Sequence, residues 1–338
     1  MKWLALFIPL AVSLSKCNNG RAEQHTNPGQ DIKPIQTEVV EEVPEIKDLT
    51  ASDIQLTKEF LFDKYILDDV YPYKDTVRSI KLDEIRRCLA FIENIQQEPK
   101  QWGVLQNYRN SNREAPLVRK FVRNAYRRVA DTLGVERFQS VPLYQPADTI
   151  TPVRYGRDGT PVYIKGKEGS FYIIRPITFT EDWYVPERYM KSLKEGTVFH
   201  HVIFVDRGDQ NLSTLEWIAR GEWKFRSTNP ATTGRRRPPY AQETPLGIFL
   251  LQQKKNKMFY LKDGTSAMGG FSPYASRFTN GAYIHGVPVN VPGTKMIEYS
   301  WSLGTIPRSH MCVRNATSHA RFIFEWAPTE ESLVIVIE

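Results

Sequence analysis

The spacing of apolar residues changes once along this chain, and that change limits the folds open to it. Over residues 52–134 apolar side chains recur at helical spacing, most clearly in the stripe 80–95. A second helix is expected over about 116–134, where a glycine suits the end of a helix. From residue 135 onward, short β-type runs alternate with turns rich in glycine, aspartate and proline. The pattern predicts a multidomain α+β protein with an N-terminal helical region followed by mostly β structure.

Composition and turn signals divide the chain into five predicted segments. The length of 338 residues, of which 41% are hydrophobic, suits two or three folded units. The predicted segments are an export signal (1–17), a flexible polar linker (18–50), a helical domain (51–136), a small β module (137–194) and a C-terminal domain (195–338). The C-terminal domain is expected to be mostly β with one helix at roughly 317–326.

The first 17 residues combine a positive charge with an apolar run too short to span a bilayer stably, which is typical of an export signal. The sequence Leu-Ser-Lys-Cys at 14–17 resembles a bacterial lipobox, in which Cys17 would receive a lipid, although Lys16 departs from that pattern. Ordinary cleavage nearby, or retention as an anchor, are the alternatives. We expect an exported protein of the periplasm or cell envelope.

The three cysteines cannot build the disulfide framework of a small exported domain, so packing must stabilise the fold. Cys88 lies on the apolar side of a predicted helix and is expected to be buried filler. The formal net charge of +7 is compatible with nucleic-acid binding, but no recognition motif is visible. We therefore expect no nucleic acid among the partners, and anionic envelope polymers or lipid headgroups instead.

The β module carries three short β-type runs separated by turns, at 141–144, 159–162 and 182–185. Their order is similar to that of bacterial SH3-like wall modules. The resemblance implies binding of wall peptide through aromatic side chains. Aromatic residues in a small β domain also commonly form its core, and that alternative stays open.

Cys312 is the residue of this chain best placed for chemistry. A thiol reacts as its thiolate, so it needs a base or cationic group nearby, and His285, His310 and Arg314 are the candidates. If residues 310–314 form a strand, His310 and Arg314 share a face with the thiol. His310 would then tune its pKa or act as a hydrogen-bonding neighbour, and Arg314 would bind a substrate carboxylate or form an internal salt bridge. Cys312 alone would be an ordinary buried side chain.

Two sequence segments precede this cysteine and a third contains it, in a fixed order along the chain. They are Glu-Thr-Pro-Leu-Gly-Ile-Phe at 243–249, Ala-Tyr-Ile-His-Gly at 282–286 and Ser-His-Met-Cys-Val-Arg-Asn at 309–315. Together they resemble the L,D-transpeptidase (YkuD-type) catalytic domain family, which carries a TPxGxF segment, a histidine followed by glycine or serine, and an S-H-G-C nucleophile motif. The resemblance begins near residue 197. Met311 stands where the family usually has glycine, a residue that takes positive φ without steric cost.

The resemblance implies a role for each residue of the motifs. Cys312 would be the nucleophile and His285 its base, with the Gly286 carbonyl holding the imidazole in one tautomer. His310 completes the predicted catalytic set, and the predicted substrate-binding set is Arg314, Ser309, Tyr283, Asn315 and Met311. No metal or other cofactor is needed for this chemistry.

The implied reaction is peptidoglycan cross-linking of the 3-3 type. The thiolate attacks a tetrapeptide stem at the L-centre of its diamino acid, releases terminal D-alanine and leaves a thioester, which an amine of another stem resolves. Water as acceptor would make the protein an L,D-carboxypeptidase, and a protein lysine would make it an anchoring enzyme. A non-catalytic wall-binding lipoprotein is the alternative outside enzymes.

Other hydrolase and transferase classes fit the sequence less well. A serine penicillin-binding enzyme needs S-x-x-K with a K-T-G partner, and the one S-x-x-K match lies at 13–16 in the export signal. The chain has no H-E-x-x-H, which argues against a zinc hydrolase. A papain-like peptidase places its cysteine before its histidine, whereas His285 precedes Cys312.

Overall fold

The computed structural model describes residues 47–98 and 100–338 of the chain. The predicted export signal, the lipidation site Cys17 and the linker up to residue 46 lie outside the described residues. Within them the α-helices are α1 (Leu82–Asn94) and α2 (Thr317–Trp326), and the 3-10 helices are η1 (Ala51–Asp53), η2 (Tyr108–Asn110) and η3 (Glu187–Tyr189). No helix of this part of the chain is long and apolar enough to cross a membrane. The structure is mostly β.

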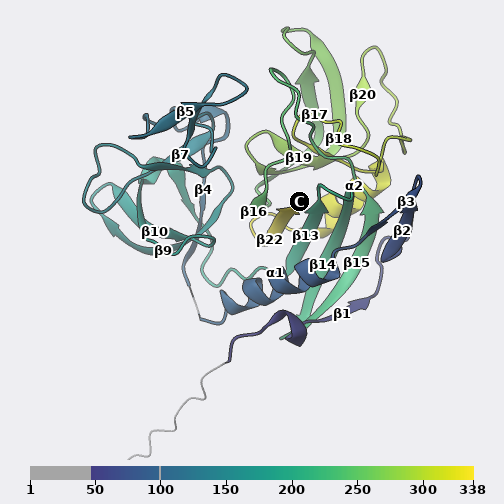
Figure 1. Ribbon diagram of the computed structural model, residues 1–338, viewed down its shortest axis with the longest axis horizontal. Helices are drawn as coiled ribbons and strands as arrows, with labels where there is room; N and C mark the ends of the chain where they lie inside the picture. The colour runs from purple at the N-terminus through teal and green to yellow at the C-terminus, as the bar shows by residue number, and fades with distance from the viewer. Residues whose placement is uncertain (1–46, 99) are drawn as a thin grey trace, which may run out of the picture. The chain divides into compact units, whose positions relative to one another are not determined.

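A six-stranded sheet organises the C-terminal half of the molecule (Figure 1). Its strands, in spatial order, are β1 (Gln55–Lys58), β15 (Glu222–Pro230), β14 (Asn211–Ala219), β13 (His201–Asp206), β22 (Ser332–Ile337) and β16 (Gly247–Leu250). The central strand β13 pairs antiparallel with β14 and parallel with β22. Side chains alternate between the faces of a strand, and 202–205 is buried throughout, so this sheet is covered on both faces.

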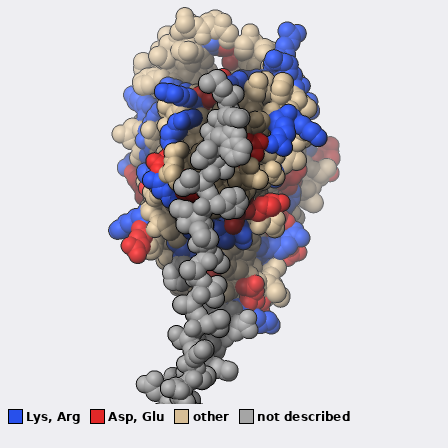
Figure 2. All heavy atoms as spheres, turned by 90° about the vertical axis from the view of Figure 1, so that its left-hand side faces the viewer, with Lys and Arg blue, Asp and Glu red and all other residues tan. Residues whose placement is uncertain are grey.

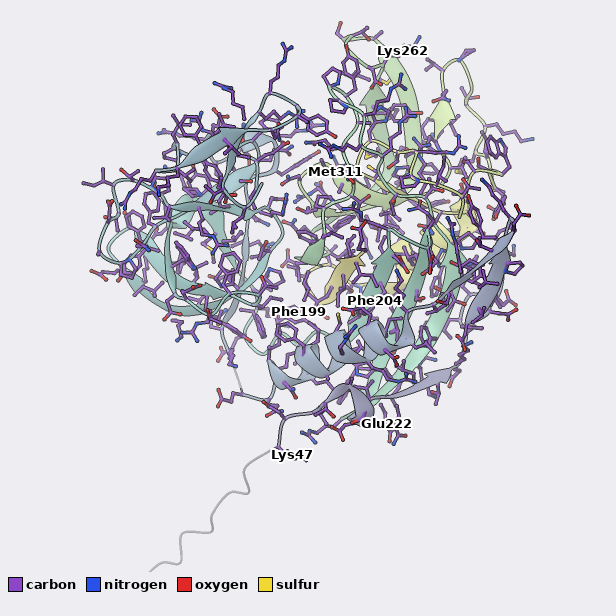
Figure 3. All side chains as sticks on the ribbon, in the orientation of Figure 1. Lys47, Phe199, Phe204, Glu222, Lys262 and Met311 are labelled. Carbon is purple, nitrogen blue, oxygen red and sulfur yellow. The ribbon has the colours of Figure 1, made fainter. Side chains whose placement is uncertain are left out.

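Helix α1 covers one face of this sheet. Ile85, Leu89 and Ile92 recur on one side of the helix and belong to the same buried cluster as Val202 and Phe204 of β13. Phe204 is labelled in Figure 3. The apolar stripe predicted over 80–95 is therefore a true helix that packs on the sheet.

A second sheet and α2 cover the opposite face. The second sheet has the path β17 (Gln253–Leu261), β18 (Met268–Thr279), β19 (Ala282–His285) and β21 (Val313–Arg314), with β20 (Val289–Asn290) paired to β18. Ile203 and Val205 of β13 share a buried cluster with Ile284, Val313 and, from α2, Ile323. The helix predicted at 317–326 is confirmed, and it packs against the sheet that carries the cysteine segment.

The predicted helical domain over 51–136 is not what the structure contains. Helix α1 accounts for 13 of its residues, and the rest includes β1, β2 (Val70–Tyr73), β3 (Thr76–Ser79), β4 (Trp102–Leu105), β5 (Phe121–Arg123) and β6 (Val129–Asp131). The helix expected over 116–134 is wrong, because β5 and β6 form an antiparallel hairpin there. The Asn124 side chain accepts hydrogen bonds from the N–H groups of Tyr126 and Arg128, which makes a turn. Gly134, with φ of 80°, serves a turn as well.

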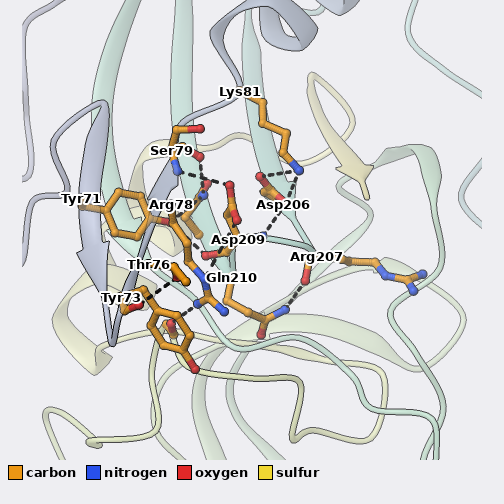
Figure 4. Close-up of polar contacts among 12 residues, drawn as sticks. Tyr71, Tyr73, Thr76, Arg78, Ser79, Lys81, Asp206, Arg207, Asp209 and Gln210 are labelled. Carbon is orange, nitrogen blue, oxygen red and sulfur yellow. Dashed lines mark hydrogen bonds and ion pairs between the residues drawn. The ribbon is translucent and has the colours of Figure 1, made fainter.

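The N-terminal strands attach to the six-stranded sheet and do not form a domain of their own. Strand β1 pairs in parallel with β15, and β2 and β3 form a hairpin. Figure 4 shows the polar network that ties this hairpin to the turn after β13, in which Tyr71 donates to the Asp209 carbonyl oxygen at 2.9 Å and Lys81 pairs with Asp206. Strand β1 is therefore an edge strand of the six-stranded sheet, and the β2–β3 hairpin is held against the turn that follows β13.

A separate five-stranded sheet has the order β11 (Trp183–Pro186), β10 (Phe171–Pro176), β9 (Pro161–Glu168), β4 and β12 (Met190–Ser192). Strands β7 (Ser140–Leu143) and β8 (Arg154–Arg157) form a hairpin beside it and share its apolar core. This is the predicted β module, but it takes β4 from upstream of the expected boundary at 136. Its likeness to SH3-like modules stays a prediction.

Asp158, at the turn between β8 and β9, connects the β module to the second sheet. This fully buried carboxylate pairs with Arg277 of β18. It also accepts hydrogen bonds from the backbone N–H groups of Asn107 and Asn280, at 2.9 and 3.0 Å. Residue 280 lies in the turn between β18 and β19, so this contact supports the strand that bears His285.

Charged side chains of both signs are interspersed on the visible part of the face shown in Figure 2.

Candidate active site

Strands β19 and β21 bring the predicted site residues together. They pair in parallel, with Ile284 opposite Val313 and His285 opposite Arg314. Because side chains alternate between faces, Ile284 and Val313 point into the buried cluster between the two sheets. Tyr283, His285 and Arg314 therefore share the other face, and Cys312 immediately precedes β21. His285, Cys312 and Arg314 line one cavity of about 870 Å³ there.

Cys312 is a free thiol, 9% exposed, in the wall of this cavity. Its Sγ lies 3.5 Å from the Gly281 carbonyl oxygen, to which the thiol donates. Burial raises the pKa of the Cys312 thiol to about 11, against the opposing effects of the Tyr283 backbone N–H and the Arg314 guanidinium. The expectation that its neighbours lower this pKa below the usual value is thus not met in the resting structure, because desolvation outweighs them.

His285 is almost completely buried and is held through one ring nitrogen. Nδ1 lies 2.6 Å from the Gly286 carbonyl oxygen. A carbonyl accepts and does not donate, so Nδ1 carries the proton and Nε2 is left as an acceptor. Burial lowers the pKa of His285 to about 4, so the ring is neutral at pH 7. In the described part of the chain, His285 and Cys312 make no direct hydrogen bond with each other.

The loop before Cys312 has a left-handed backbone conformation at Met311. Met311 has φ of 92°, in the region that favours glycine. Its carbonyl oxygen accepts a hydrogen bond of 2.8 Å from Thr244 Oγ1, which also accepts one from the Gly234 N–H. Ser309 Oγ donates to the Cys312 carbonyl. The threonine of the segment 243–249 thus clamps the cysteine loop.

His310 is not placed as the sequence suggested. Residues 309–312 are not a strand, and the positive φ of Met311 breaks the alternation of side chains. His310 is exposed, with Nε2 3.0 Å from an Asp263 carboxylate oxygen in the turn between β17 and β18. Lys262, labelled in Figure 3, marks the tip of that hairpin. His310 therefore lies at the rim of the cavity, and the idea that it shares a strand face with the thiol is wrong.

Arg314 has no carboxylate partner among the described residues, so the internal salt bridge weighed above is absent there. Its Nε atom is buried without a hydrogen-bond partner within that same part of the chain. Burial is the main cause that lowers the pKa of Arg314. The guanidinium is thus a partly buried cation beside the thiol, free to bind an anion.

The remaining predicted residues have supporting positions. Asn315 is fully buried, and its backbone N–H donates to the His285 carbonyl at 3.0 Å. Tyr283 is buried behind the thiol, and its hydroxyl lies 3.1 Å from that of Tyr108. Gly286 contributes its carbonyl, and Ser309 lines the cavity. Asn315 and Tyr283 hold the strands that present the site and do not line the cavity.

Sequence reasoning missed the walls of the cavity. One wall comes from the β17–β18 hairpin and the other from the segment 287–301; the apolar lining residues include Tyr240, Tyr260, Leu261, Ile297, Tyr299 and Trp301. Trp301 is 76% exposed, although tryptophan side chains are usually well buried. A run of apolar residues without regular spacing, as at 296–301, was the available signal.

The N-terminal stretch reaches one of these walls. The Arg78 guanidinium donates to the Gly304 carbonyl oxygen at 2.6 Å, and the rings of Tyr65 and Tyr299 lie 4.6 Å apart between centroids. The wall formed by 297–304 is therefore held from residues that precede the C-terminal domain.

The described residues hold no group of three or more His, Cys, Asp or Glu side chains arranged for a metal ion.

The model of the YkuD L,D-transpeptidase catalytic domain family matches residues 200–336. No curated protein matches the chain.

Several solved structures resemble part of the chain. One is a fused Zn-dependent amidase/peptidase/peptidoglycan-binding domain-containing protein from Clostridium acetobutylicum, with 17% identity over 41% of this chain and 52% of that one, and a TM-score of 0.29. The chain thus spans about half of that protein. An L,D-transpeptidase from Mycobacterium smegmatis has 16% identity over 52% of this chain and 82% of that one, with a TM-score of 0.34. L,D-transpeptidase 3 from Mycobacterium tuberculosis was solved with a faropenem-derived adduct. It has 19% identity over 52% of this chain and 79% of that one, with a TM-score of 0.34.

The family match covers β13, the clamp at Thr244, the His285 strand and the Cys312 loop, which are the segments that build the cavity. Residues 200–336 of this chain belong to the YkuD L,D-transpeptidase catalytic domain family.

Proposed function

We propose that this protein is a peptidoglycan L,D-transpeptidase that forms 3-3 cross-links through a thioester on Cys312. One observation carries the proposal: His285 and Arg314, on two adjacent strands of the family domain, and Cys312, in the loop before the second of them, line the same cavity of about 870 Å³. That volume suits a peptide segment.

The acylation step uses the neutral forms of both side chains. Cys312 gives its proton to Nε2 of His285 as sulfur attacks the carbonyl of the L-centre of the stem diamino acid. The bond to terminal D-alanine then breaks, the imidazolium returns the proton to the departing amine, and a thioester remains. Since burial disfavours both thiolate and imidazolium in the resting site, proton transfer is coupled to substrate binding.

Gly286 and Met311 prepare the site for this step. The Gly286 carbonyl keeps a proton on Nδ1, so Nε2 is the acceptor of the thiol proton in the resting site. The positive φ of Met311 reproduces the glycine conformation of the motif. Among residues 47–98 and 100–338, the backbone N–H of Cys312 has no hydrogen-bond partner. This N–H is therefore available to stabilise the oxyanion of the tetrahedral intermediate.

Arg314 is proposed to bind a carboxylate of the stem peptide. It lies two residues beyond the nucleophile, it lines the cavity, and it has no carboxylate partner in the described part of the chain. A guanidinium binds a carboxylate through two parallel hydrogen bonds, which fixes the orientation of the peptide.

The acceptor defines which reaction completes the cycle. A side-chain amine of a second stem gives the 3-3 cross-link, water gives an L,D-carboxypeptidase, and a lysine of another protein gives an anchoring enzyme. The exposed apolar wall at Tyr299 and Trp301 supports a second peptide chain as acceptor, because it extends the cavity beyond the thiol.

The test compares the full chain with its Cys312→Ala and His285→Gln variants on tetrapeptide muropeptides. We expect D-alanine release, cross-linked dimers and a Cys312 thioester, each detected by mass spectrometry, from the wild type alone. Equal behaviour of wild type and Cys312→Ala would favour a non-catalytic wall-binding lipoprotein. D-alanine release without dimers would identify the carboxypeptidase.

We also propose that the protein acts in the cell envelope, exported by residues 1–17 and anchored by a lipid on Cys17. The motif at 14–17 supports this. Metabolic labelling with a fatty acid should mark the wild type and not Cys17→Ser, and recovery of unlabelled wild type in the cytoplasm would refute both parts.

A further inference from the structure

Two arginines outside the predicted site lie beside Arg314. The backbone N–H of Arg314 donates to the Thr232 carbonyl, and that of Arg308 donates to the Thr233 carbonyl, each at 2.9 Å. The N–H of Arg235 donates to the Ser309 carbonyl at 3.1 Å. The short segment 232–235 therefore gathers Arg235, Arg308 and Arg314 around the cysteine loop.

These three guanidinium groups share one property. Each is partly buried, each has a buried Nε without a hydrogen-bond partner, and none is paired with a carboxylate within the described residues. The charges of Arg235 and Arg308 act on Arg314 and help to lower its pKa. Three like charges in a partly desolvated place repel one another unless an anion lies among them.

Nearby acidic groups do not fill this role. Asp263 pairs with His310, Glu243 pairs with Arg207, and Glu298 bonds to Ser318. Arg308 instead stacks on Trp301, with 4.8 Å from its guanidinium carbon to the ring centroid, and Trp301 lines the cavity. Arg314 itself lines the cavity next to the nucleophile, and Arg308 contacts the cavity wall at Trp301.

We infer that Arg235, Arg308 and Arg314 form one anion site that selects peptide donors with a free carboxylate next to the reacting bond. The inference rests on the proposed function. In such a donor, one nitrogen and one carbon separate the terminal carboxylate from the reacting carbonyl. A group held at Cys312 therefore places that carboxylate within reach of Arg314, which lies two residues further along the chain and lines the same cavity. Donors with an amidated terminus lack the charge and are rejected.

The first experiment requires no cell-wall activity. Iodoacetate and iodoacetamide both alkylate a thiolate, with iodide as the leaving group, but iodoacetate alone carries a carboxylate. The rate of Cys312 modification by each reagent is measured on the full chain by peptide mass spectrometry. The rate with iodoacetate is divided by the rate with iodoacetamide. This ratio is then divided by the ratio that the same two reagents give with a small free thiol.

We expect this normalised ratio to exceed one in the wild type. It should fall by about tenfold in Arg235→Gln and in Arg308→Gln, the size of one charge-assisted hydrogen bond. Arg236→Gln is the matched control, because Arg236 is an exposed neighbour on the same loop, and it should leave the ratio unchanged. Thermal melting of each variant checks that it folds.

The inference is overturned if Arg235→Gln and Arg308→Gln keep the wild-type ratio, if Arg236→Gln lowers it equally, or if iodoacetate cannot modify Cys312. A second experiment compares a tetrapeptide with a free terminal carboxylate and its terminal amide as acyl donors. Preference for the carboxylate form in the wild type, lost in both variants, supports the inference, and equal use of the two donors refutes it. A chain that shows the alkylation effect and acylates with neither peptide would refute the proposed function and retain the anion site.

Discussion

Cys312 and His285 show how burial sets protonation in this site. The thiol pKa is raised to about 11 and the imidazole pKa is lowered to about 4, and desolvation is the largest cause of both shifts. Both side chains are therefore neutral over most of the pH range. A thiol in this state is protected from adventitious reaction until a substrate enters and the proton moves to Nε2.

The His285 pKa predicts how stability depends on pH. Between pH 6.5 and 4 the unfolded chain binds a proton at this residue that the folded protein does not, so the free energy of unfolding falls as the pH falls. The shift corresponds to about 3 kcal/mol between pH 7 and pH 4. In His285→Gln, the free energy of unfolding measured with urea should change between pH 7 and pH 4 by about 3 kcal/mol less than in the wild type. His319, whose pKa burial lowers to about 3, remains in the variant as the source of the residual slope. An unchanged slope in His285→Gln would contradict the buried neutral imidazole.

The positive φ of Met311 predicts which substitutions its loop accepts. A β-branched side chain is a steric outlier at φ of 92°, whereas leucine matches methionine in size without branching at Cβ. We expect Met311→Val to lower the free energy of unfolding by about 1–2 kcal/mol more than Met311→Leu. Urea denaturation measures both, and equal stability of the two variants would argue against the strained backbone.

At the level of elements, the N-terminal hairpin β2–β3 supports a part of the cavity that lies far from it in sequence. Arg78 stacks on Tyr73 with 3.4 Å from its guanidinium carbon to the ring centroid, and the same guanidinium reaches Gly304. Figure 4 shows that Arg78 lies in the network with Asp209. The wall 297–304 is thus fixed by an element outside the family match.

Removal of this support is predicted to loosen the wall and leave the strands that carry Cys312 intact. Arg78→Ala should lower the local opening free energy of residues 297–304 by about 1–2 kcal/mol, the worth of a hydrogen bond to a charged group. Hydrogen exchange followed by mass spectrometry resolves this segment. Arg87→Ala on the exposed side of α1 is the control and should leave the exchange of residues 297–304 unchanged. If residues 297–304 exchange their amide hydrogens as slowly in Arg78→Ala as in the wild type, the wall does not depend on the Arg78 contact.

At the scale of the whole molecule, the β module and the second sheet are joined by a buried ion pair. Asp158 is fully buried and satisfied by Arg277, by the Gln252 side chain and by two backbone N–H groups. Loss of one partner leaves an uncompensated buried charge, which is far more costly than the loss of an exposed pair.

Asp158→Asn is therefore expected to lower the free energy of unfolding by about 3–5 kcal/mol. Asp182→Asn, which breaks the more exposed pair with Arg175, should cost about 1 kcal/mol or less. Chemical denaturation compares the two. A loss in Asp158→Asn no larger than in Asp182→Asn would mean that the two sheets do not depend on this contact.

Strong local patterns were predicted correctly from the sequence. The apolar stripe 80–95 predicts α1, and the segment 317–326 predicts α2. The apolar face of a helix can be recognised from residue spacing alone, because the spacing does not depend on what the helix packs against. The hairpin at 121–131 was mistaken for a helix, because arginines and apolar residues there recur at a spacing that both structures tolerate. The hairpin is stabilised at its turn, where the N–H groups of Tyr126 and Arg128 donate to the Asn124 side chain.

The sequence by itself determined the identity and order of the reactive motifs, since these are properties of neighbouring residues along the chain. It placed Cys312, His285 and Arg314 in the site but also put His310 on the wrong face. Tertiary structure alone decided that β1 completes the C-terminal sheet, that Thr244 clamps the cysteine loop, and that Arg235 and Arg308 stand beside Arg314. Those facts depend on pairing between segments distant in sequence, and on burial, which no local pattern records.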